Sequence, residues 1–406
     1  MSLSTIIVIV ASAFWLMILY HVVLTIAGLI HRAQTSPPET SAQYPSVDIL
    51  IPAHNEGGVL FHTLDAMSKI QYPGKLEVYL LNDNSTDNTS DIAQYYADRL
   101  ANIYHIKVPA GSPKGKARVL NYGVSISAGD LVVVYDADNQ PNPDAVKLLV
   151  EKTLENDHNA GAVGTVRTIN MQKNSLTRMI GLEFMVFQLL MQSGRWLLFR
   201  LGTYTGTNML VRRSVLAEIG GWDEHALAED TELSMRIVSR GFVIPVVPSS
   251  ITYEQEPETL GVWIRQRSRW LRGNLYTISK LVKDPDLRHG QNLLNIVQML
   301  TIYYAFMALL LFSDVWFVLG LLGILQIHFT IPLLILWFET VWIYAAQIVA
   351  ATVSERQASF TNILFGVLMY FTYSQLWIYL VIKEYFFQLT HHVQNVEPVW
   401  DKTPRF

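Results

Sequence analysis

A long apolar stretch near the start of the chain restricts most strongly what this sequence can fold into. Residues 3–30 contain no acidic or basic side chain apart from His21. The hydrocarbon core of a bilayer is about 30 Å thick, and a helix of about 20 apolar residues crosses it. No basic segment precedes the stretch and no clear cleavage site follows it. The sequence therefore predicts a membrane anchor over residues 1–32 rather than a cleaved signal peptide.

Further apolar stretches lie in the later part of the chain. Between residues 293 and 351 the only charged side chains are Asp314 and Glu339, and another apolar stretch covers residues 360–382. These stretches predict two to three additional spans. The chain is thus expected to be a multi-pass protein of the cell membrane.

The middle of the chain has the character of a soluble domain. The chain of 406 residues is 16% charged, against about 25% in an average soluble protein, and its apolar excess lies in the flanking stretches. The absence of cysteine excludes disulfides and thiolate metal sites. The net charge is −4 and no long basic run occurs, so no nucleic-acid partner is expected. Basic residues beside the apolar stretches favour a cytoplasmic middle domain: Arg32, Lys280, Lys283 and Arg288.

Strand and helix patterns alternate four times in this middle domain. Apolar runs at residues 47–52, 76–81, 103–108 and 131–136 predict strands, and helically spaced apolar residues lie between them. A further strand is expected at residues 161–168. The alternation predicts an α/β fold with a doubly wound, mostly parallel sheet, whose ligands bind at the carboxyl edge.

Two carboxylates end the fourth predicted strand. Asp136 and Asp138 are two positions apart, and side chains at i and i+2 of a strand point to the same side. Two hard oxygen ligands facing one point suit Mg²⁺ or Mn²⁺ carried by a diphosphate. Taken alone, a strand-to-turn junction is the simpler explanation, because Asp is common there.

Two other groups could bind a nucleotide at the same edge. Asp83 ends the second strand, where an acidic residue can accept from a base N–H or a ribose hydroxyl, although residues 82–87 alone are more typical of a helix N-cap. Lys114 and Lys116 precede a helix N-terminus, which is a natural anion site. By themselves they are more typical of solvated surface lysines.

The second half of the domain offers a candidate base and a candidate acceptor site. Asp230 could take the proton of an acceptor hydroxyl, although acidic residues at a helix start are also ordinary caps. Residues 266–270 (QRSRW) place an amide, two forked cations and an indole together, and Arg suits a pyrophosphate. Residues 176–201 and 256–281 are too charged to span a bilayer, so amphipathic helices on the membrane surface are expected there. Basic and aromatic membrane anchors would explain the QRSRW segment about as well.

Six short motifs occur in an order that resembles family 2 glycosyltransferases. The likeness is greatest to the membrane-embedded processive synthases of cellulose, chitin, hyaluronan and, closest in size and layout, bacterial poly-N-acetylglucosamine. It covers about residues 46–285, and residues 400–405 (WDKTPR) add a similar tail motif. The motifs are 51–56 (IPAHNE), 82–87 (NDNSTD), 114–117 (KGKA), 136–138 (DAD), 229–230 (ED) and 266–270 (QRSRW).

The resemblance implies a GT-A nucleotide-sugar-binding fold and a role for each matching residue. Asp230 would be the catalytic base, and Asp138 would bind Mg²⁺ or Mn²⁺ on the UDP phosphates. The nucleotide sugar would contact Ala53, Asn55, Glu56, Asp83, Lys116 and Asp136. The acceptor or the diphosphate would contact Gly206, Thr207, Glu229, Gln266, Arg267, Arg269 and Trp270.

Two positions depart from the motifs of the family. Asn82 stands where the family usually has Asp, and His54 stands where an aromatic such as Tyr is common. Because Asp83 is kept, nucleotide binding is expected to persist. The stacking on uracil is expected to differ.

The predicted activity is inverting, metal-dependent transfer of a hexose from a UDP-sugar to a growing exopolysaccharide, of the kind found in biofilms, with export across the membrane. N-acetylglucosamine is the expected sugar, and a single base without a second nucleophile indicates direct displacement. One alternative is transfer of a single sugar to a lipid acceptor, such as polyprenyl phosphate or diacylglycerol. Another is a non-catalytic membrane scaffold of an export complex. The expected partners are the UDP-sugar, a polysaccharide or lipid acceptor, membrane lipid and, as an option, a small accessory membrane subunit.

The expected domain order follows from these features. With three spans after the domain, residues 400–405 would lie outside the cell, whereas similar synthases bring this motif to the catalytic pocket. If the tail reaches the pocket here too, one apolar segment cannot cross the membrane. The candidate is residues 360–382, interrupted at 372–375, which would be re-entrant or lie flat. Glu339, an acid within an apolar stretch, is expected to face the polymer path. The predicted segments are an N-terminal transmembrane helix (1–32), a linker (33–45), a cytoplasmic GT-A catalytic domain (46–255), an interface helix region carrying QRSRW (256–290), a C-terminal transmembrane region (291–387) and a tail (388–406).

Overall fold

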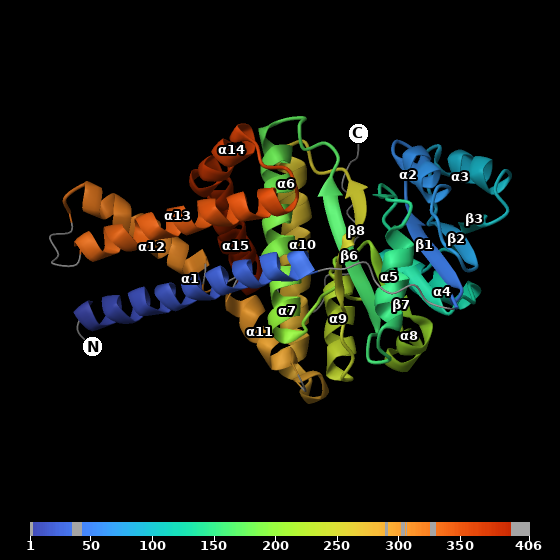
Figure 1. Cartoon of the computed structure of the whole chain (residues 1–406), viewed down its shortest axis with the longest axis horizontal. Helices are drawn as coiled ribbons and strands as arrows, with labels where there is room; N and C mark the ends of the chain where they lie inside the picture. The colour runs from blue at the N-terminus through green and yellow to red at the C-terminus, as the bar shows by residue number, and fades with distance from the viewer. Residues whose placement is uncertain are drawn as a thin grey trace.

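A sheet covered by helices lies beside a separate layer of helices in the computed structural model (Figure 1). The structure describes residues 3–34, 43–288, 291–301, 305, 307–324 and 330–390. Helices α1 (Leu3–Gln34), α12 (Met307–Leu321) and α13 (Thr330–Ser354) extend away from the sheet. Most of the predicted linker and tail, including the motif at residues 400–405, lies outside the described residues.

The described strands form one sheet of eight strands in the order β3-β2-β1-β4-β7-β6-β8-β5. The strands predicted at the start of the domain are confirmed, and β1 pairs parallel with both β2 and β4. Every residue of β1 is buried, as expected for a strand covered on both faces. The bounds are β1 (Val47–Ala53), β2 (Leu76–Asn82), β3 (Ile103–Lys107), β4 (Leu131–Val134), β5 (Gln140–Pro141), β6 (Gly161–Thr168), β7 (Met209–Arg212) and β8 (Val246–Glu254).

Strand β7 makes the sheet mixed, which the sequence pattern did not predict. It pairs antiparallel with β4 on one side and with β6 on the other, and β6 pairs parallel with β8. Because β7 runs opposite to both β4 and β6, these two strands run in the same direction. Strand β8 also runs in this direction, since it is parallel to β6. The carboxyl ends of β4, β6 and β8 therefore meet at one edge, which brings Asp138 and Glu254 together although they are far apart in the chain.

Helices cover both faces of the sheet, and each face has its own apolar core. One core joins the strands to α2, α3 and α5, and the other joins them to α4, α8 and α9. This confirms the predicted α/β fold, although the sheet is mixed, with β5 and β7 antiparallel to their neighbours. The bounds are α2 (Leu60–Met67), α3 (Thr89–Ala97), α4 (Lys116–Ile126), α5 (Ala145–Leu154), α8 (Arg213–Ile219) and α9 (Glu229–Ser239).

The two segments predicted as amphipathic helices are helical, and they stand between the sheet and the apolar helices (Figure 1). The first comprises α6 (Ser175–Phe187), the π-helix η1 (Gln188–Gly194) and α7 (Arg195–Phe199), and the second is α10 (Leu260–Lys283). Their apolar side chains pack with those of α1, α13, α14 (Phe360–Phe371) and α15 (Tyr373–Thr390). Their predicted position on a membrane surface stays a prediction.

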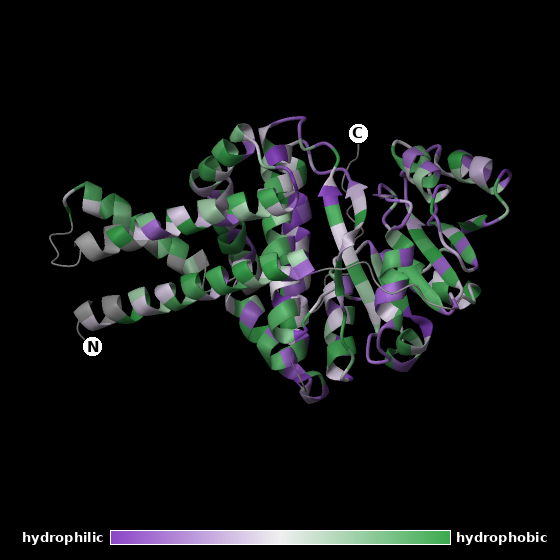
Figure 2. Ribbon diagram, viewed as in Figure 1, coloured by the Kyte–Doolittle hydropathy of each residue, from purple (hydrophilic) through white to green (hydrophobic). Residues whose placement is uncertain are grey.

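Two helical stretches among the described residues are long and apolar enough to cross a membrane. They cover residues 9–34 and 360–387, and the second is broken at Thr372, where α14 ends and α15 begins. Figure 2 shows that the helices extending away from the sheet are mostly apolar along their length. Helix α12 is a shorter apolar helix, and η2 (Pro285–Arg288) and α11 (Asn292–Leu300) connect α10 to it. The predicted number of spans stays a prediction.

A buried ion cluster joins the end of α1 to the rest of the protein. Glu355, just after α13, pairs with Arg32 of α1 and with Arg167 of β6, the latter at 2.6 Å. Only 4% of Glu355 is exposed. Buried charges are stable in such places only when they are paired, so this cluster fixes α1 against the sheet.

Candidate active site

A cavity of about 500 Å³ lies where the carboxyl edge of the sheet meets the helical layer. One wall comes from the ends of β1, β4 and β8 and from the start of α4. The opposite wall comes from the helix α6–η1–α7 and from α10, and α9 contributes the side between them. The predicted residues that line it are Glu56, Lys116, Asp136, Asp138, Gly206, Glu229, Asp230, Gln266, Arg269 and Trp270.

Three carboxylates gather at the sheet edge of this cavity. Asp136, Asp138 and Glu254 each offer an oxygen, and these oxygens lie within 4.8 Å of one another. Asp138 is buried and accepts from the backbone N–H of Gln255 at 3.4 Å, while Asn139 donates to Glu254 at 3.2 Å. Hard oxygen ligands at this spacing suit Mg²⁺ or Mn²⁺, so the residues present fit a divalent cation.

Lys116, the first residue of α4, neutralises one carboxylate of this cluster. Its ammonium lies 2.6 Å from Asp136 and 3.4 Å from Glu229, and it donates to the carbonyl of Gly206 at 2.6 Å. Burial lowers the pKa of Lys116, but the charges of Asp136 and Glu229 outweigh burial and raise this pKa overall. Lys116 therefore stays charged and pairs with Asp136, one of the three carboxylates of the cluster.

Asp230 faces the cavity from the first turn of α9. Burial raises the pKa of Asp230 to about 7, the charge of Glu229 adds to this shift, and Lys116 opposes it. The backbone N–H of Thr231 donates to the Asp230 carboxylate at 2.7 Å. A carboxylate with a pKa near neutrality is well matched to general-base catalysis.

Gly206 lies beside both Asp230 and Lys116, in a backbone conformation that favours glycine. A Cβ at this position would lie 3.5 Å from the Asp230 carboxylate and 3.6 Å from the Lys116 nitrogen. The backbone φ of +84° is also a conformation that L side chains rarely adopt. A substitution here would therefore be strained by its backbone conformation, while its Cβ would only touch Asp230 and Lys116.

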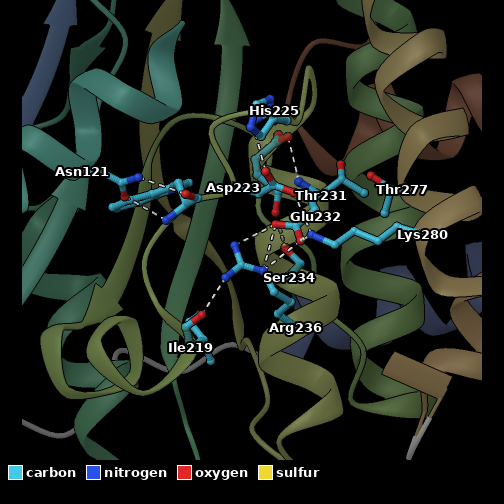
Figure 3. Close-up of polar contacts among 12 residues, drawn as sticks. Asn121, Ile219, Asp223, His225, Thr231, Glu232, Ser234, Arg236, Thr277 and Lys280 are labelled. Atoms are coloured by element: carbon cyan, nitrogen blue, oxygen red, sulfur yellow. Dashed lines mark hydrogen bonds and ion pairs between the residues drawn. The ribbon is translucent and has the colours of Figure 1, made fainter. Parts of the chain in front are cut away.

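A polar network fixes the loop that leads into Asp230 (Figure 3). Lys280 of α10 pairs with Asp223 and with Glu232, both at 2.6 Å, and Arg236 pairs with Glu232 at 2.7 Å. Burial raises the pKa of Asp223, but the hydrogen bonds from Lys280, His225 and Tyr276, together with the charge of Lys280, outweigh burial and lower this pKa overall. The network thereby holds α9 and the loop before it against α10.

The QRSRW segment of α10 divides its side chains between the cavity and the interior. Gln266, Arg269 and Trp270 line the cavity, and the Nε of Arg269 has no hydrogen-bond partner among the described residues. Arg267 differs from the prediction. It is fully buried outside the cavity lining, where its guanidinium lies 4.0 Å from the centre of the Trp270 ring.

Glu183 of α6 is the counter-ion of Arg267. Its carboxylate accepts from Arg267 at 2.8 Å, from the Tyr373 hydroxyl at 2.7 Å and from the Trp377 indole at 2.9 Å. Burial lowers the pKa of Arg267, but Glu183 together with Tyr373 and Glu256 outweighs burial and raises this pKa overall. Arg267 thus supports Trp270 from behind and joins α10 to α6 and α15.

Comparison of the sequence with known protein families shows which family the chain belongs to. Residues 45–273 match the family described as glycosyltransferase-like family 2. A probable glycosyltransferase, YdaM of Bacillus subtilis (strain 168), is 39% identical over 413 residues, which cover 99% of this chain and 98% of that protein. The chain belongs to glycosyltransferase family 2. It is therefore a glycosyltransferase.

Two more distant likenesses agree with this family. The poly-β-1,6-N-acetyl-D-glucosamine synthase of Staphylococcus aureus (strain MW2) is 28% identical over 227 residues, which cover 56% of this chain and 54% of that protein. The mannosyltransferase PcManGT of Pyrobaculum calidifontis, solved with GDP-Man and Mn²⁺, has a TM-score of 0.58 at 18% identity. It covers 89% of this chain and 98% of that one, which shows a shared fold.

Three of the predicted nucleotide-sugar contacts lie outside the cavity lining: Ala53, Asn55 and Asp83. Asp83 is buried at the end of β2 and pairs with Arg118 of α4 at 2.6 Å, and its backbone N–H donates to Ala53 at 2.8 Å. Asn55 has a φ of +55° and accepts from the backbone N–H of Thr86 at 2.7 Å, which joins the loops after β1 and β2. Their role in nucleotide binding stays a prediction.

Thr207 also differs from the contact expected for it. It is 2% exposed, accepts from the backbone N–H of Asp136 at 3.2 Å and donates to Asn139. Because Asn139 donates in turn to Glu254, Thr207 connects the end of β4 to the end of β8. It supports the carboxylate cluster from inside the protein.

Three residues of the site were missed by sequence reasoning. Glu254 ends a strand, and only the position of β8 beside β6 brings it to the cluster. Glu183 is an acid within an apolar helix, which was a usable signal for a buried partner. Arg118, two residues after Lys116, carried no signal that separates it from a surface arginine.

Proposed function

We propose that this family 2 enzyme is a processive, inverting glycosyltransferase that polymerises an exopolysaccharide from a UDP-sugar, with N-acetylglucosamine as the sugar. One observation carries the proposal: a candidate base, Asp230, and a three-carboxylate cluster face the same cavity, and Gln266 and Trp270 line its opposite wall. The likeness to a poly-N-acetylglucosamine synthase supports the choice of sugar.

The donor diphosphate is placed between the carboxylate cluster and Arg269. Asp138 and Glu254 would hold a divalent cation, which when bound supplies positive charge to the leaving diphosphate. Lys116 and Arg269 add positive charge from two other sides, and Arg269 has an unpaired Nε for a phosphate oxygen. Stabilising the charge of the leaving group is the largest contribution expected from such a site.

The acceptor hydroxyl is placed at Asp230. Its oxygen bonds to the anomeric carbon as the bond from that carbon to the diphosphate breaks, and its proton passes to Asp230. The nucleoside diphosphate leaves with the electron pair. Attack from the face opposite the leaving group inverts an α-linked donor to a β-linked product.

Trp270 is placed under the terminal sugar of the growing chain. Its ring is supported by Arg267 and lies 6.3 Å from the ring of Phe184, so the indole is held from two sides. A rigid apolar surface is suited to a polymer that must slide by one sugar after each transfer. The apolar helices beyond it would provide the path for export in a multi-pass protein whose catalytic domain is cytoplasmic, with a small accessory subunit as a further option.

The experiment is to incubate membranes that contain the protein with labelled UDP-N-acetylglucosamine, UDP-glucose or UDP-glucuronate, each separately. The proposal predicts UDP release and a ladder of high-molecular-mass product from one donor, lost when the divalent cation is chelated. A labelled product of lipid size alone would instead establish transfer of single sugars. Absence of UDP release from every donor would contradict glycosyl transfer from UDP-sugars.

A further inference from the structure

An arginine without an acidic partner lies in the helical wall of the cavity. Arg195, the first residue of α7, lines the cavity and is 6% exposed. It donates to the side-chain oxygen of Asn295, its Nε has no hydrogen-bond partner, and no ion pair reaches it among the described residues. Burial lowers the pKa of Arg195 to about 10, which leaves it charged at neutral pH. A buried charge without a counter-ion is costly, so it indicates a ligand.

The protein holds this arginine in a fixed position. The π-helix before it is joined to the sheet by Gln188, whose amide makes two hydrogen bonds of 2.7 Å to the backbone of Val166. Gln192 donates to the carbonyl of Thr203 at 2.8 Å. π-Helical turns are rare and often lie at functional sites.

Helix α1 closes the outer side of the same segment. A Cβ on Gly194 would lie 2.4 Å from the carbonyl oxygen of Leu24, and a Cβ on Gly28 would lie 2.2 Å from that of Leu189. The two backbones are therefore in direct contact, and only glycine fits at either position. The buried charge thus lies directly behind a helix that is long and apolar enough to cross a membrane.

The cavity around the arginine is largely apolar. Phe187 and Met191 line it on the π-helical side, and Met235 and Met299 line it from α9 and α11. Flexible methionine side chains adapt to long apolar ligands. A guanidinium binds phosphate oxygens as a fork, with two parallel hydrogen bonds. An apolar chain ending in a phosphate matches both features.

We propose that Arg195 binds the phosphate of a lipid-linked glycosyl acceptor, whose sugar hydroxyl points toward Asp230 in the same cavity. This inference rests on the proposed glycosyl transfer and identifies its acceptor class. The phosphate takes no part in the bond changes, so Arg195 positions the acceptor. A lipid-linked acceptor of this kind would serve as the primer of the polymer.

The test measures binding of decyl phosphate to the full chain in nanodiscs of phosphatidylcholine, by calorimetry and without a sugar donor. We expect decyl phosphate to bind and Arg195→Gln to weaken it about 10- to 100-fold, the range of a lost charge-assisted hydrogen bond. The control is Arg200→Gln at the end of the same helix, an exposed arginine outside the cavity lining, which should leave binding unchanged. Decanol binding should be equal in all three proteins.

A second variant covers the case in which Arg195→Gln fails to fold. Met191→Glu places a carboxylate one turn before Arg195 on the same wall, where it can pair with the guanidinium. It should keep the fold, measured by thermal unfolding, and lose the binding of decyl phosphate. Unchanged binding in this variant would overturn the proposal.

Other outcomes identify a different ligand. Equal affinity for inorganic phosphate and decyl phosphate would overturn the lipid part of the proposal. Binding of an oligogalacturonate through Arg195, without binding of decyl phosphate, would assign the site to an acidic polysaccharide and overturn it. UDP release by the wild-type protein in the same nanodiscs tests the proposed function separately, because the binding experiment needs no donor.

Discussion

The two walls of the cavity are built in different ways. The sheet wall presents acidic groups from strand ends, where Asp138 and Glu254 meet because three strands run in one direction. The helical wall presents basic and aromatic groups from α10 and α7, each supported by buried contacts such as the pair of Arg267 with Glu183. We expect the sheet wall to bind the donor and its cation, and the helical wall to hold the acceptor.

The first prediction concerns the candidate base between the two walls. Asp230→Asn should lower turnover about 10²- to 10⁴-fold, the usual contribution of a general base, while UDP binding measured by calorimetry stays nearly unchanged. The matched control is Asp223→Asn, which changes a carboxylate of the supporting loop that does not line the cavity. Near-normal turnover by Asp230→Asn would remove this residue from the mechanism.

Asp230→Asn should also change how the free energy of unfolding depends on pH. The folded pKa of Asp230 lies above its unfolded value, so the folded state holds the proton more tightly and the free energy of unfolding falls as pH rises from about 4 through about 7. Asn cannot titrate. Thermal unfolding should therefore show Asp230→Asn to be stabilised relative to the wild type at pH 8 and less so at pH 4.

The sheet could be predicted from the sequence better than the helical wall. Each parallel strand at the start of the domain is a local apolar run that ends in polar residues, such as Asp136 and Asp138, and Asp230 stands in the acidic start of a helix. The antiparallel β7, and with it Glu254 in the cluster, depends on pairing between distant strands, which no local pattern specifies. Such pairing follows from the packing of the whole domain.

In the helical wall, the motif alone did not predict which side chains face the cavity. The QRSRW motif predicted residues of the cavity wall, but neighbouring residues of a helix point in different directions. Arg267 accordingly faces Glu183 while Arg269 faces the cavity. The unpaired charge of Arg195 was also not visible in the sequence, since the absence of a partner is a property of the folded chain.

The second prediction tests the sheet wall. Glu254→Gln should raise the Mn²⁺ concentration needed for half-maximal activity about 10- to 100-fold, because one oxygen ligand loses its charge. Glu258→Gln changes an acid four residues further on, outside the cluster, and should leave this concentration unchanged. If wild type and Glu254→Gln need the same Mn²⁺ concentration, Glu254 is not a ligand of the cation, and only Asp136 and Asp138 remain as candidates.

The third prediction tests the support of the helical wall. Glu183→Gln leaves Arg267 buried without a counter-ion and should lower the free energy of unfolding by about 3 kcal/mol. A double variant, Glu183→Leu with Arg267→Met, should recover most of this stability but still raise the KM for the acceptor, because Trp270 loses its support. Thermal unfolding and acceptor titration separate the two effects. Full recovery of the KM would make the pair purely structural.

The smallest predicted effect is a shift in the pH profile. Turnover limited by Asp230 should rise about tenfold per pH unit below a pKa near 7 and level off above it. Glu229→Gln removes a charge that raises this pKa, so the rising limb should move to lower pH by up to about one unit. A limb that moves to higher pH, or does not move, would contradict the electrostatic account of the base.

The most direct test of the central claim is the position of the cation. A crystal of the full chain grown with UDP and Mn²⁺ should show one anomalous scattering peak at the sheet wall, about 2.0 to 2.6 Å from oxygens of Asp138 and Glu254. Asp230 should not bind the ion. A peak that is bound by Asp230, or that lies away from Asp138 and Glu254, would contradict the division of labour between the two walls.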